Sequence, residues 1–408
     1  MKVIEGGITA ASGFRAAGVH CGIKKEKLDL ALILSDTPAR VAIAYTRNKV
    51  RAAPIEVMMN KDPEFLQAFV ANSGNANALT GSKGMEDAIA MVAQTAKELG
   101  ISGDLVGVAS TGVIGKYLPM DKLTAGIPNV VGLLGKGTVS DDMAASAIMT
   151  TDTVKKEAAC KVTLGDGTIV IIGGMAKGSG MISPAMKALH ATTLSFVTTD
   201  ALLTKRADGK WQRALDRSFN MINVDGDQST NDISVLMANG AAGGKSVDDD
   251  PSFWEGVEYV LKSLAKMIVV DGEGATKLIE VIIKGASSES DARVAAKAVV
   301  SSNLVKAAVF GADPNFGRIL AAIGNSGCEF DLSKLQLTMA SNGTSMSLFE
   351  KGVPLIWSDS KIESTAREIM AGKKITIGLD LGVGDSSAEA WGCDLSYDYV
   401  KINAQYTT

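Results

Sequence analysis

Strand-like segments in this chain occur in groups, and single helix-like segments separate the groups. Segments 30–36 and 39–46 are rich in apolar and β-branched residues and predict two adjacent strands joined by a short proline-containing link. Segment 161–174 places Asp166-Gly167 between two β-branched runs, which is typical of a β-hairpin. The strict alternation of strand and helix expected of a doubly wound sheet is missing. The pattern therefore predicts an α+β layered sandwich.

Further segments extend this assignment toward the C-terminus. Segment 85–100 has helical spacing and ends on a glycine, and residues 252–255 form a capping-box pattern that predicts a helix to about residue 268. Segment 277–285 predicts a strand. Segment 290–311 predicts a helix at its beginning, with a strand as one option for its end. The tail, residues 393–406, alternates in polarity and predicts a terminal strand.

Composition limits the class of protein. The chain has 408 residues, of which 46% are hydrophobic, and this is enough for a sizeable core in two or three domain-sized units. Only 5% of the residues are aromatic, so we expect a core of mainly Ala, Val, Ile, Leu and Met. The net charge of −4 comes from mixed acids and bases without a basic block, which argues against nucleic-acid binding.

The sequence also predicts where the protein is found. Its first residues lack the apolar core of a signal peptide, and no apolar run approaches the roughly 18 residues of a membrane span. The four cysteines are far apart and form no C-x-x-C pair, which argues against a disulfide framework or a zinc site. We therefore expect a cytoplasmic protein with free, buried thiols, no membrane contact and no metal.

A glycine-rich segment, residues 173–201, contains the most specific chemical signal. It carries Lys177 and then an Ala191-Thr192 bond. A threonine hydroxyl is a poor nucleophile, but cutting the bond before Thr192 would free an α-amine next to that hydroxyl. Such an amine has an unperturbed pKa of about 7.7–8.0 and can act as the base. The segment thus indicates a self-cleaving acyl-transfer enzyme, with an ordinary strand and glycine turn as the alternative.

Two shorter motifs fit this chemistry. The Thr111 hydroxyl and the Gly112 amide could stabilise an oxyanion, although Thr-Gly pairs also occur in simple turns. Glu273 lies between two glycines and could bind a substrate amine, or could be an exposed acid in a turn.

Other motifs are excluded or left structural. The chain has two histidines and no G-x-S-x-G elbow, which argues against a serine triad, and we take His190 as non-catalytic. Segment 223–232 resembles a calcium loop, but Thr230 and Leu236 occupy the positions that an EF-hand gives to glycine and glutamate. We interpret this segment as a structural loop or a site wall. No phosphate-binding glycine motif is present.

Taken together and in order, segments along nearly the whole chain resemble the glutamate N-acetyltransferase/ornithine acetyltransferase family of arginine biosynthesis. Any one segment can arise by chance, but the ordered set is highly specific. The segments are GFRAAGVHCGIKK, LALILSD, RNKVRAAPIEV, NSGNANALTG, ASTGVIGKYLPM, IMTTDTVKK, GMAKGSGMISP, ATTLSFVTTDA, NVDGDQSTND, DGEGATK, GADPNFGRI and WGCDLSYDYVKINAQYTT.

The resemblance implies an α+β layered sandwich that cleaves itself between Ala191 and Thr192. The resulting chains, residues 1–191 and 192–408, would stay together and pair into heterotetramers of two α and two β chains. The reaction implied is acetyl transfer from N2-acetylornithine to glutamate through an acetyl-threonine intermediate, which gives ornithine and N-acetylglutamate. Acetyl-CoA is possible as a second donor, and no metal or bound cofactor is expected.

The resemblance also assigns residues. Thr192 matches the nucleophile and new N-terminus, and Thr111 and Gly112 match the oxyanion hole. One threonine of TTDT matches a substrate contact, and we choose Thr151, with Thr153 as the alternative. The remaining substrate-contacting positions are Lys177, Thr192, Glu273, Asn403 and Thr408.

The sequence departs from the family pattern at one place. Residues 187–190, KALH, intervene between Met186 and Ala191, where family members run directly into Ala-Thr. The match downstream identifies Thr192 rather than Thr193 as the nucleophile. The extra residues lie on the leaving side of the bond, so we expect them to affect the rate of cleavage.

Two alternatives to the transferase stay open. One is an amidohydrolase or aminopeptidase with the same N-terminal nucleophile, in which water replaces glutamate as the acceptor. The other is an uncleaved, inactive binding protein.

Overall fold

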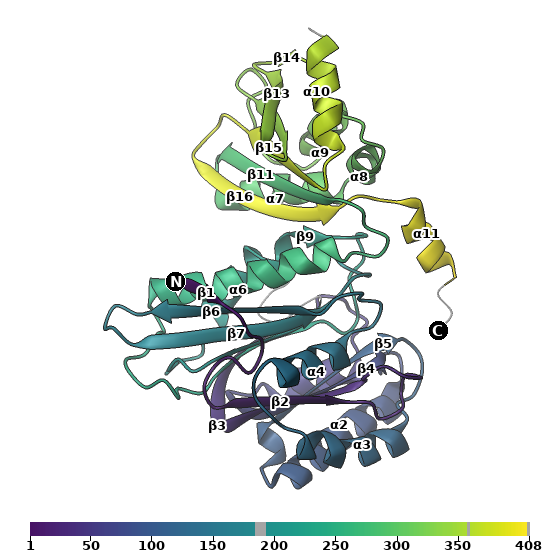
Figure 1. Ribbon diagram of the computed structural model, residues 1–408, viewed down its shortest axis with the longest axis vertical. Helices are drawn as coiled ribbons and strands as arrows, with labels where there is room; N and C mark the ends of the chain where they lie inside the picture. The colour runs from purple at the N-terminus through teal and green to yellow at the C-terminus, as the bar shows by residue number, and fades with distance from the viewer. Residues whose placement is uncertain (184–192, 357–359, 406–408) are drawn as a thin grey trace. The chain divides into compact units, whose positions relative to one another are not determined.

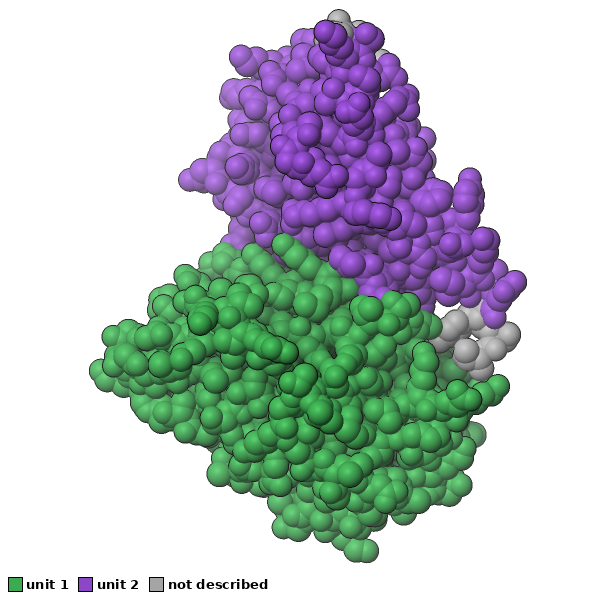
Figure 2. Space-filling view, in the orientation of Figure 1, with its two compact units in different colours: residues 1–178, 184–220, 227–268 green, residues 179–183, 221–226, 269–408 purple. Residues whose placement is uncertain are grey.

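The computed structural model describes residues 1–183, 193–356 and 360–405. The chain forms two compact units, each built on its own β-sheet (Figure 1 and Figure 2). Unit 1 comprises residues 1–178, 184–220 and 227–268, and unit 2 comprises residues 179–183, 221–226 and 269–408. Both sheets are mixed and carry helices on their faces, so the predicted α+β layered class is confirmed.

In the described part of unit 1, nine strands form one sheet in the order β1-β6-β7-β8-β10-β3-β4-β5, with β2 paired to β3. Most neighbours are antiparallel, but β8 and β10 are parallel, as are β4 and β5. The strands are β1 (Lys2–Ile4), β2 (Phe14–Val19), β3 (Leu30–Tyr45), β4 (Phe65–Asn75), β5 (Val106–Val113), β6 (Lys156–Thr163), β7 (Ile169–Lys177), β8 (Leu194–Thr199) and β10 (Ile233–Ala238).

Helices cover this sheet. Figure 1 shows α6 lying along β6 and β7, and α4 packs on β2 and β3. The core is mainly aliphatic, as the composition predicts, with one close aromatic pair between Phe69 and Phe196. The helices are α1 (Ala53–Lys61), α2 (Gly81–Leu99), α3 (Met120–Gly132), α4 (Thr138–Ile148), α5 (Asp208–Asp216) and α6 (Pro251–Val270), with short 3₁₀ turns at Gly103–Leu105 and Phe219–Met221.

Unit 2 has a smaller sheet, with seven strands among its described residues in the order β14-β13-β12-β15-β11-β16-β9. Helix α7 packs on β11 and β16. The strands are β9 (Ile222–Asn223), β11 (Leu278–Ala286), β12 (Gln336–Ser341), β13 (Thr344–Glu350), β14 (Val353–Pro354), β15 (Lys374–Asp380) and β16 (Ser386–Cys393). The helices are α7 (Glu289–Ser301), α8 (Asn303–Phe310), α9 (Phe316–Gly324), α10 (Ser360–Met370) and α11 (Tyr397–Ala404).

Several predicted elements are confirmed, namely the helix of segment 85–100 as α2, the hairpin of 161–174 as β6 and β7, and the strand of 277–285 as β11. The prediction of two separate strands for residues 30–46 is wrong, because this segment forms the single strand β3. The ladder between β3 and β4 shifts register between Leu34 and Ala39, and this irregularity accommodates Pro38, which has no N–H to donate.

The predicted start of α6 and the predicted tail also need correction. The Asp250 carboxylate, rather than Ser252, caps α6 by accepting the Phe253 amide at 2.9 Å. Segment 290–311 ends in a second helix, α8, and not in a strand. The tail is not a strand either, because the Ser396 hydroxyl accepts the amides of Asp398 and Tyr399 and starts α11.

Candidate active site

Several predicted site residues lie outside the described residues, namely Ala191, Thr192 and Thr408, together with the insertion at 187–190. The neighbourhood of the nucleophile is therefore built from the start of β8, two residues after Thr192. Lys177, the last residue of β7, is paired with Leu194 across the antiparallel ladder. On the other side, the Ile233 amide at the start of β10 donates to the Thr193 carbonyl at 2.8 Å. Lys177 and the start of β10 thus flank the beginning of β8.

A buried asparagine joins this region to the predicted oxyanion hole. The Asn231 side-chain amide donates to the carbonyls of Ser110, at 2.7 Å, and Ala76, at 2.6 Å, and its side-chain oxygen accepts the Thr230 hydroxyl. Asn231 lies two residues before β10, and Ser110 comes directly before Thr111. The sequence analysis interpreted segment 223–232 as a structural loop or a site wall. In the structure, Asn231 in the second half of this segment links β10 to β5 through hydrogen bonds.

Thr111 and Gly112 lie near the carboxyl end of β5, beside the parallel strand β4. Thr111 is 6% exposed. Gly112 has φ of +133°, and a Cβ at this position would lie 2.3 Å from the Gly74 carbonyl carbon. Only glycine fits, because both the backbone angle and the close approach exclude a side chain. The backbone of β5 at Gly112 is therefore held closely against β4.

A network of buried asparagines stabilises the same end of β4. The Ser110 hydroxyl donates to Asn72 Oδ1 at 2.6 Å, and Asn72 Nδ2 donates to the Asn75 carbonyl at 3.0 Å. The Asn75 side chain in turn bonds the Tyr117 carbonyl and the Asn77 amide, both at 2.8 Å. A buried polar network whose members are all hydrogen-bonded holds a rigid shape. The network gives Asn72 and Asn75 of the segment NSGNANALTG a structural role.

On the other side of β8, an ionic cluster surrounds Asp152. Its buried carboxylate accepts the Gly178 amide at 2.6 Å, Lys156 Nζ at 2.7 Å and the Thr150 amide at 2.9 Å. Burial by itself would raise the pKa of Asp152, but the charges of Lys177 and Lys156 and these hydrogen bonds outweigh it and lower the pKa to about 2. Asp152 therefore stays ionised and anchors the turn at 150–152 to the end of β7.

Lys177 points its ammonium toward this turn. Lys177 Nζ lies 3.3 Å from the hydroxyl of Thr150, the residue before Thr151. Thr151 is half-buried and Thr153 is exposed. The choice of Thr151 over Thr153 as the substrate contact stays a prediction.

In unit 2, the structure brings Glu273 and Asn403 together. Asn403 Nδ2 donates to Glu273 Oε2 at 3.0 Å, and the Glu273 amide donates to the Ser179 carbonyl at 2.9 Å. A Cβ on Gly180 would lie 2.4 Å from the Glu273 carboxyl group, so the glycine makes room for this carboxylate.

Asp225 holds the segment that follows Gly180. Its carboxylate accepts the Met181 amide at 2.6 Å and the Ile182 amide at 2.9 Å. This residue of the rejected calcium motif therefore has a structural role.

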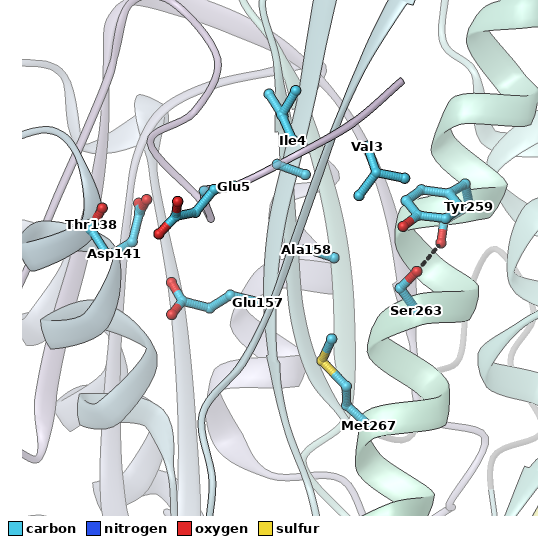
Figure 3. Close-up of a pocket in the computed structure, with 12 residues that line it drawn as sticks. Val3, Ile4, Glu5, Thr138, Asp141, Glu157, Ala158, Tyr259, Ser263 and Met267 are labelled. Carbon is cyan, nitrogen blue, oxygen red and sulfur yellow. Dashed lines mark hydrogen bonds between the residues drawn. The ribbon is translucent and has the colours of Figure 1, made fainter. Parts of the chain in front are cut away.

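A separate cavity of about 340 Å³ in unit 1 is lined by none of the predicted site residues (Figure 3). Figure 3 shows the carboxyl groups of Glu5, Asp141 and Glu157 in one part of it, with residues of α6 in another. Burial, with the charges of Asp141 and Asp142, raises the pKa of Glu157 to about 7.

Metal, thiol and membrane features are limited. The described residues contain no group of three or more His, Cys, Asp or Glu side chains placed to hold a metal ion. The four cysteines are free thiols, of which Cys21 is half-buried and the other three are buried. In the same parts of the chain, no helix is long and apolar enough to cross a membrane.

Curated proteins with similar sequences match over essentially the whole chain. Arginine biosynthesis bifunctional protein ArgJ of Caldanaerobacter subterraneus subsp. tengcongensis is 47% identical, and the match covers 100% of both chains. The ArgJ protein of Bacillus subtilis is 44% identical over 99% of this chain and 97% of that protein. Glutamate N-acetyltransferase of Methanocaldococcus jannaschii is 45% identical over 100% of both.

Two solved structures match part of the chain. The crystal structure of ArgJ from Bacillus halodurans is 43% identical, with a TM-score of 0.44, over 45% of this chain and 96% of that chain. Ornithine acetyltransferase of Mycobacterium tuberculosis, complexed with ornithine, is 42% identical, with a TM-score of 0.41, over 45% and 98%. The sequence model of the ArgJ family matches residues 15–408. The chain belongs to the ArgJ family.

Proposed function

We propose that this chain transfers an acetyl group from N2-acetylornithine to glutamate in arginine biosynthesis. Its membership of the ArgJ family supports this activity, as does its similarity to a glutamate N-acetyltransferase along the whole length of both chains. The observation that carries the proposal is the surroundings of the start of β8. Lys177 is paired with Leu194, and Asn231 joins the start of β10 to the strand of Thr111.

Self-cleavage comes first in the proposed mechanism. The Thr192 hydroxyl attacks the Ala191 carbonyl carbon, the peptide C–N bond breaks, and an ester links Ala191 to the Thr192 oxygen. Water then hydrolyses the ester, which releases the Ala191 carboxylate and leaves Thr192 with a free α-amine and hydroxyl. After cleavage, β8 would begin only two residues after the new N-terminus. It is nevertheless hydrogen-bonded to β7 on one side and to β10 on the other. This pairing supports two chains, 1–191 and 192–408, that stay together in one sheet.

Acetyl transfer then proceeds in two halves. The Thr192 hydroxyl attacks the acetyl carbonyl of N2-acetylornithine while its α-amine takes the proton, and the Thr111 hydroxyl and Gly112 amide stabilise the oxyanion. The tetrahedral intermediate collapses, the proton passes to the leaving amine, and ornithine departs from an acetyl-threonine ester. The amine of glutamate attacks this ester, which gives N-acetylglutamate and regenerates the hydroxyl of Thr192.

The substrates carry groups of both charges, and these match two of the predicted contact residues. Both acetylornithine and glutamate carry an α-carboxylate, for which the Lys177 ammonium is the matching group. The side-chain amine of ornithine matches the Glu273 carboxylate, which Asn403 orients by a hydrogen bond. The assignments of Thr151 and Thr408 as further contacts stay predictions, as do acetyl-CoA as a second donor, the heterotetramer and the cytoplasmic location.

A two-substrate assay tests the function against the hydrolase alternative. Purified protein is incubated with N2-acetylornithine, and ornithine release is measured with and without glutamate. A transferase releases ornithine in step with N-acetylglutamate and depends on glutamate. Equal release in its absence, with free acetate as the product, would establish the hydrolase instead.

The first prediction concerns cleavage. The purified protein should run on a denaturing gel as two fragments, residues 1–191 and 192–408, because the cut creates the catalytic amine. Thr192→Ala should remain one chain and lose transfer together with cleavage, whereas Thr192→Ser should still cleave because it keeps a hydroxyl. A wild-type chain that stays intact yet transfers acetyl groups at full rate would contradict the mechanism. An N-terminus at Thr193 would move the nucleophile by one residue.

The second prediction concerns the oxyanion hole. Thr111→Ala should lower the rate of acetyl transfer by about 10²–10³, the loss typical for one oxyanion donor. Thr111→Ser, which keeps the hydroxyl, serves as the matched control and should retain most of the activity. A loss below about tenfold in Thr111→Ala would assign the stabilisation to backbone amides alone.

The third prediction uses the room that Gly180 leaves for Glu273. Gly180→Ala should displace the Glu273 carboxylate without unfolding the chain, because the obstructing atoms end a flexible side chain. The KM for N2-acetylornithine should rise roughly ten- to hundredfold, as in Glu273→Gln, because both lose one charge-assisted contact. Gly324→Ala, at a helical glycine with open space, is the control and should leave KM unchanged.

The double variant Gly180→Ala/Glu273→Gln sharpens this test. Because the two substitutions remove the same contact, their effects on KM should not add. An unchanged KM in Gly180→Ala, or fully additive effects, would show that Glu273 does not bind the substrate amine.

A further inference from the structure

A second lysine, Lys24, is directed at the same turn as Lys177, and the loop that carries it is tightly built. This loop, residues 20–29 between β2 and β3, folds around the buried carboxylate of Asp29. Asp29 accepts the amides of Cys21 at 2.6 Å, Lys24 at 2.9 Å and Gly22 at 3.1 Å. A buried carboxylate with three backbone donors fixes the backbone around it. The position from which the Lys24 side chain departs is therefore rigid.

The ammonium of Lys24 reaches across to the end of α4. Lys24 Nζ donates to the Met149 carbonyl at 2.6 Å and to the Leu28 carbonyl at 2.8 Å. Met149 comes directly before Thr150, whose hydroxyl contacts Lys177. Lys24 thus ties its own loop to the turn that Asp152 and Lys177 also hold.

The stem of Lys24 passes the other half of the site. A Cβ on Gly74 would lie 3.1 Å from Lys24 Cγ, and Gly74 is paired with Gly112 of the predicted oxyanion hole. Lys24 therefore extends from the paired glycines of β4 and β5 to the turn beside Lys177. None of the sequence motifs assigned a role to this residue.

The charges around Lys24 leave an excess of positive charge. Burial lowers the pKa of Lys24 to about 8; Asp29 and Asp152 act in the opposite direction, while Lys27 and Lys177 add to the lowering. Asp152 is ion-paired with Lys156 at 2.7 Å and also interacts with the charge of Lys177, while Asp29 interacts with Lys24. These two carboxylates are therefore outnumbered by four lysines, namely Lys24, Lys27, Lys156 and Lys177. A carboxylate that enters here would meet two ammonium groups.

We propose that Lys24 is a positioning residue of the acetyl-transfer site. Its ammonium fixes the Met149 carbonyl, and thereby Thr150 and Lys177, and adds a second positive charge for the carboxylates of acetylornithine and glutamate. This inference rests on the proposed acetyl transfer. Because glutamate carries two carboxylates, the second half of the reaction depends on Lys24 more than the first half does.

The test compares Lys24→Met, which keeps the length of the stem, with Lys24→Arg, which keeps the charge. Lys25→Met, at an exposed lysine in the same loop, is the matched control. Near pH 7, Lys24→Met should raise the KM for glutamate about tenfold, with a smaller change in kcat, and Lys24→Arg and Lys25→Met should stay near the wild type.

The pH profile separates a charge from a merely structural contact. Lys24 carries its charge below its pKa of about 8 and loses it as the pH rises through that value. Between about pH 7 and pH 9, the KM for glutamate should therefore rise more steeply in the wild type than in Lys24→Arg, whose guanidinium stays charged. Titration of glutamate itself is common to both proteins and cancels in this comparison.

Each outcome is decisive. An unchanged KM in a folded Lys24→Met, or parallel pH profiles for the wild type and Lys24→Arg, would overturn the role of Lys24 while wild-type transfer stands. If Lys24→Met fails to fold, the comparison with Lys24→Arg decides by itself. A wild-type protein without glutamate-dependent ornithine release would instead overturn the proposed function, and this inference with it.

Discussion

The pairing of β8 between β7 and β10 is the constraint on which the rest of the site depends. Backbone hydrogen bonds on both sides fix the strand that begins two residues after Thr192. The same pairing sets Lys177 opposite Leu194 and places the start of β10 against Thr193. A short strand inside a sheet has both its edges bonded, so its position does not depend on an intact peptide bond before it. A chain that is cut there can keep its site.

Buried polar side chains link the strands on either side of β8 to the other segments of the site. Asn231 connects the start of β10 to the strand of Thr111, and Asp152 connects the end of β7 to the turn at 150–152. Both use a buried side chain to hydrogen-bond backbone groups of a distant or neighbouring segment, and buried backbone groups are costly if they have no partner. The groups proposed for catalysis thus lie next to segments that these side-chain hydrogen bonds hold in place.

The sequence predicted the layered class and most of the elements, because periodicity and turn residues are local signals. It failed at the tail, where an alternating pattern suggested a strand but the Ser396 cap starts α11. Thr111, Gly112 and Glu273 were singled out by their own motifs, and the resemblance assigned them roles together with Lys177 and Asn403. The structure places Glu273 beside Asn403.

The supporting residues were not predictable in the same way. Asn231 contacts a residue 121 positions away, and Lys24 contacts one 125 positions away. No local pattern records such a contact, because it arises only when distant strands come together in the sheet. Gly180 was not predictable for a similar reason, because its role depends on the space that it leaves for the distant Glu273 carboxylate.

The central claim is that acetyl groups pass through Thr192. Its most direct test is to incubate the cleaved protein with N2-acetylornithine carrying an isotopically labelled acetyl group, without glutamate, and to measure the mass of the 192–408 chain. The account predicts one labelled acetyl group on residue 192, which leaves as labelled N-acetylglutamate when glutamate is added. An unmodified chain in a preparation that transfers acetyl groups at full rate would contradict it.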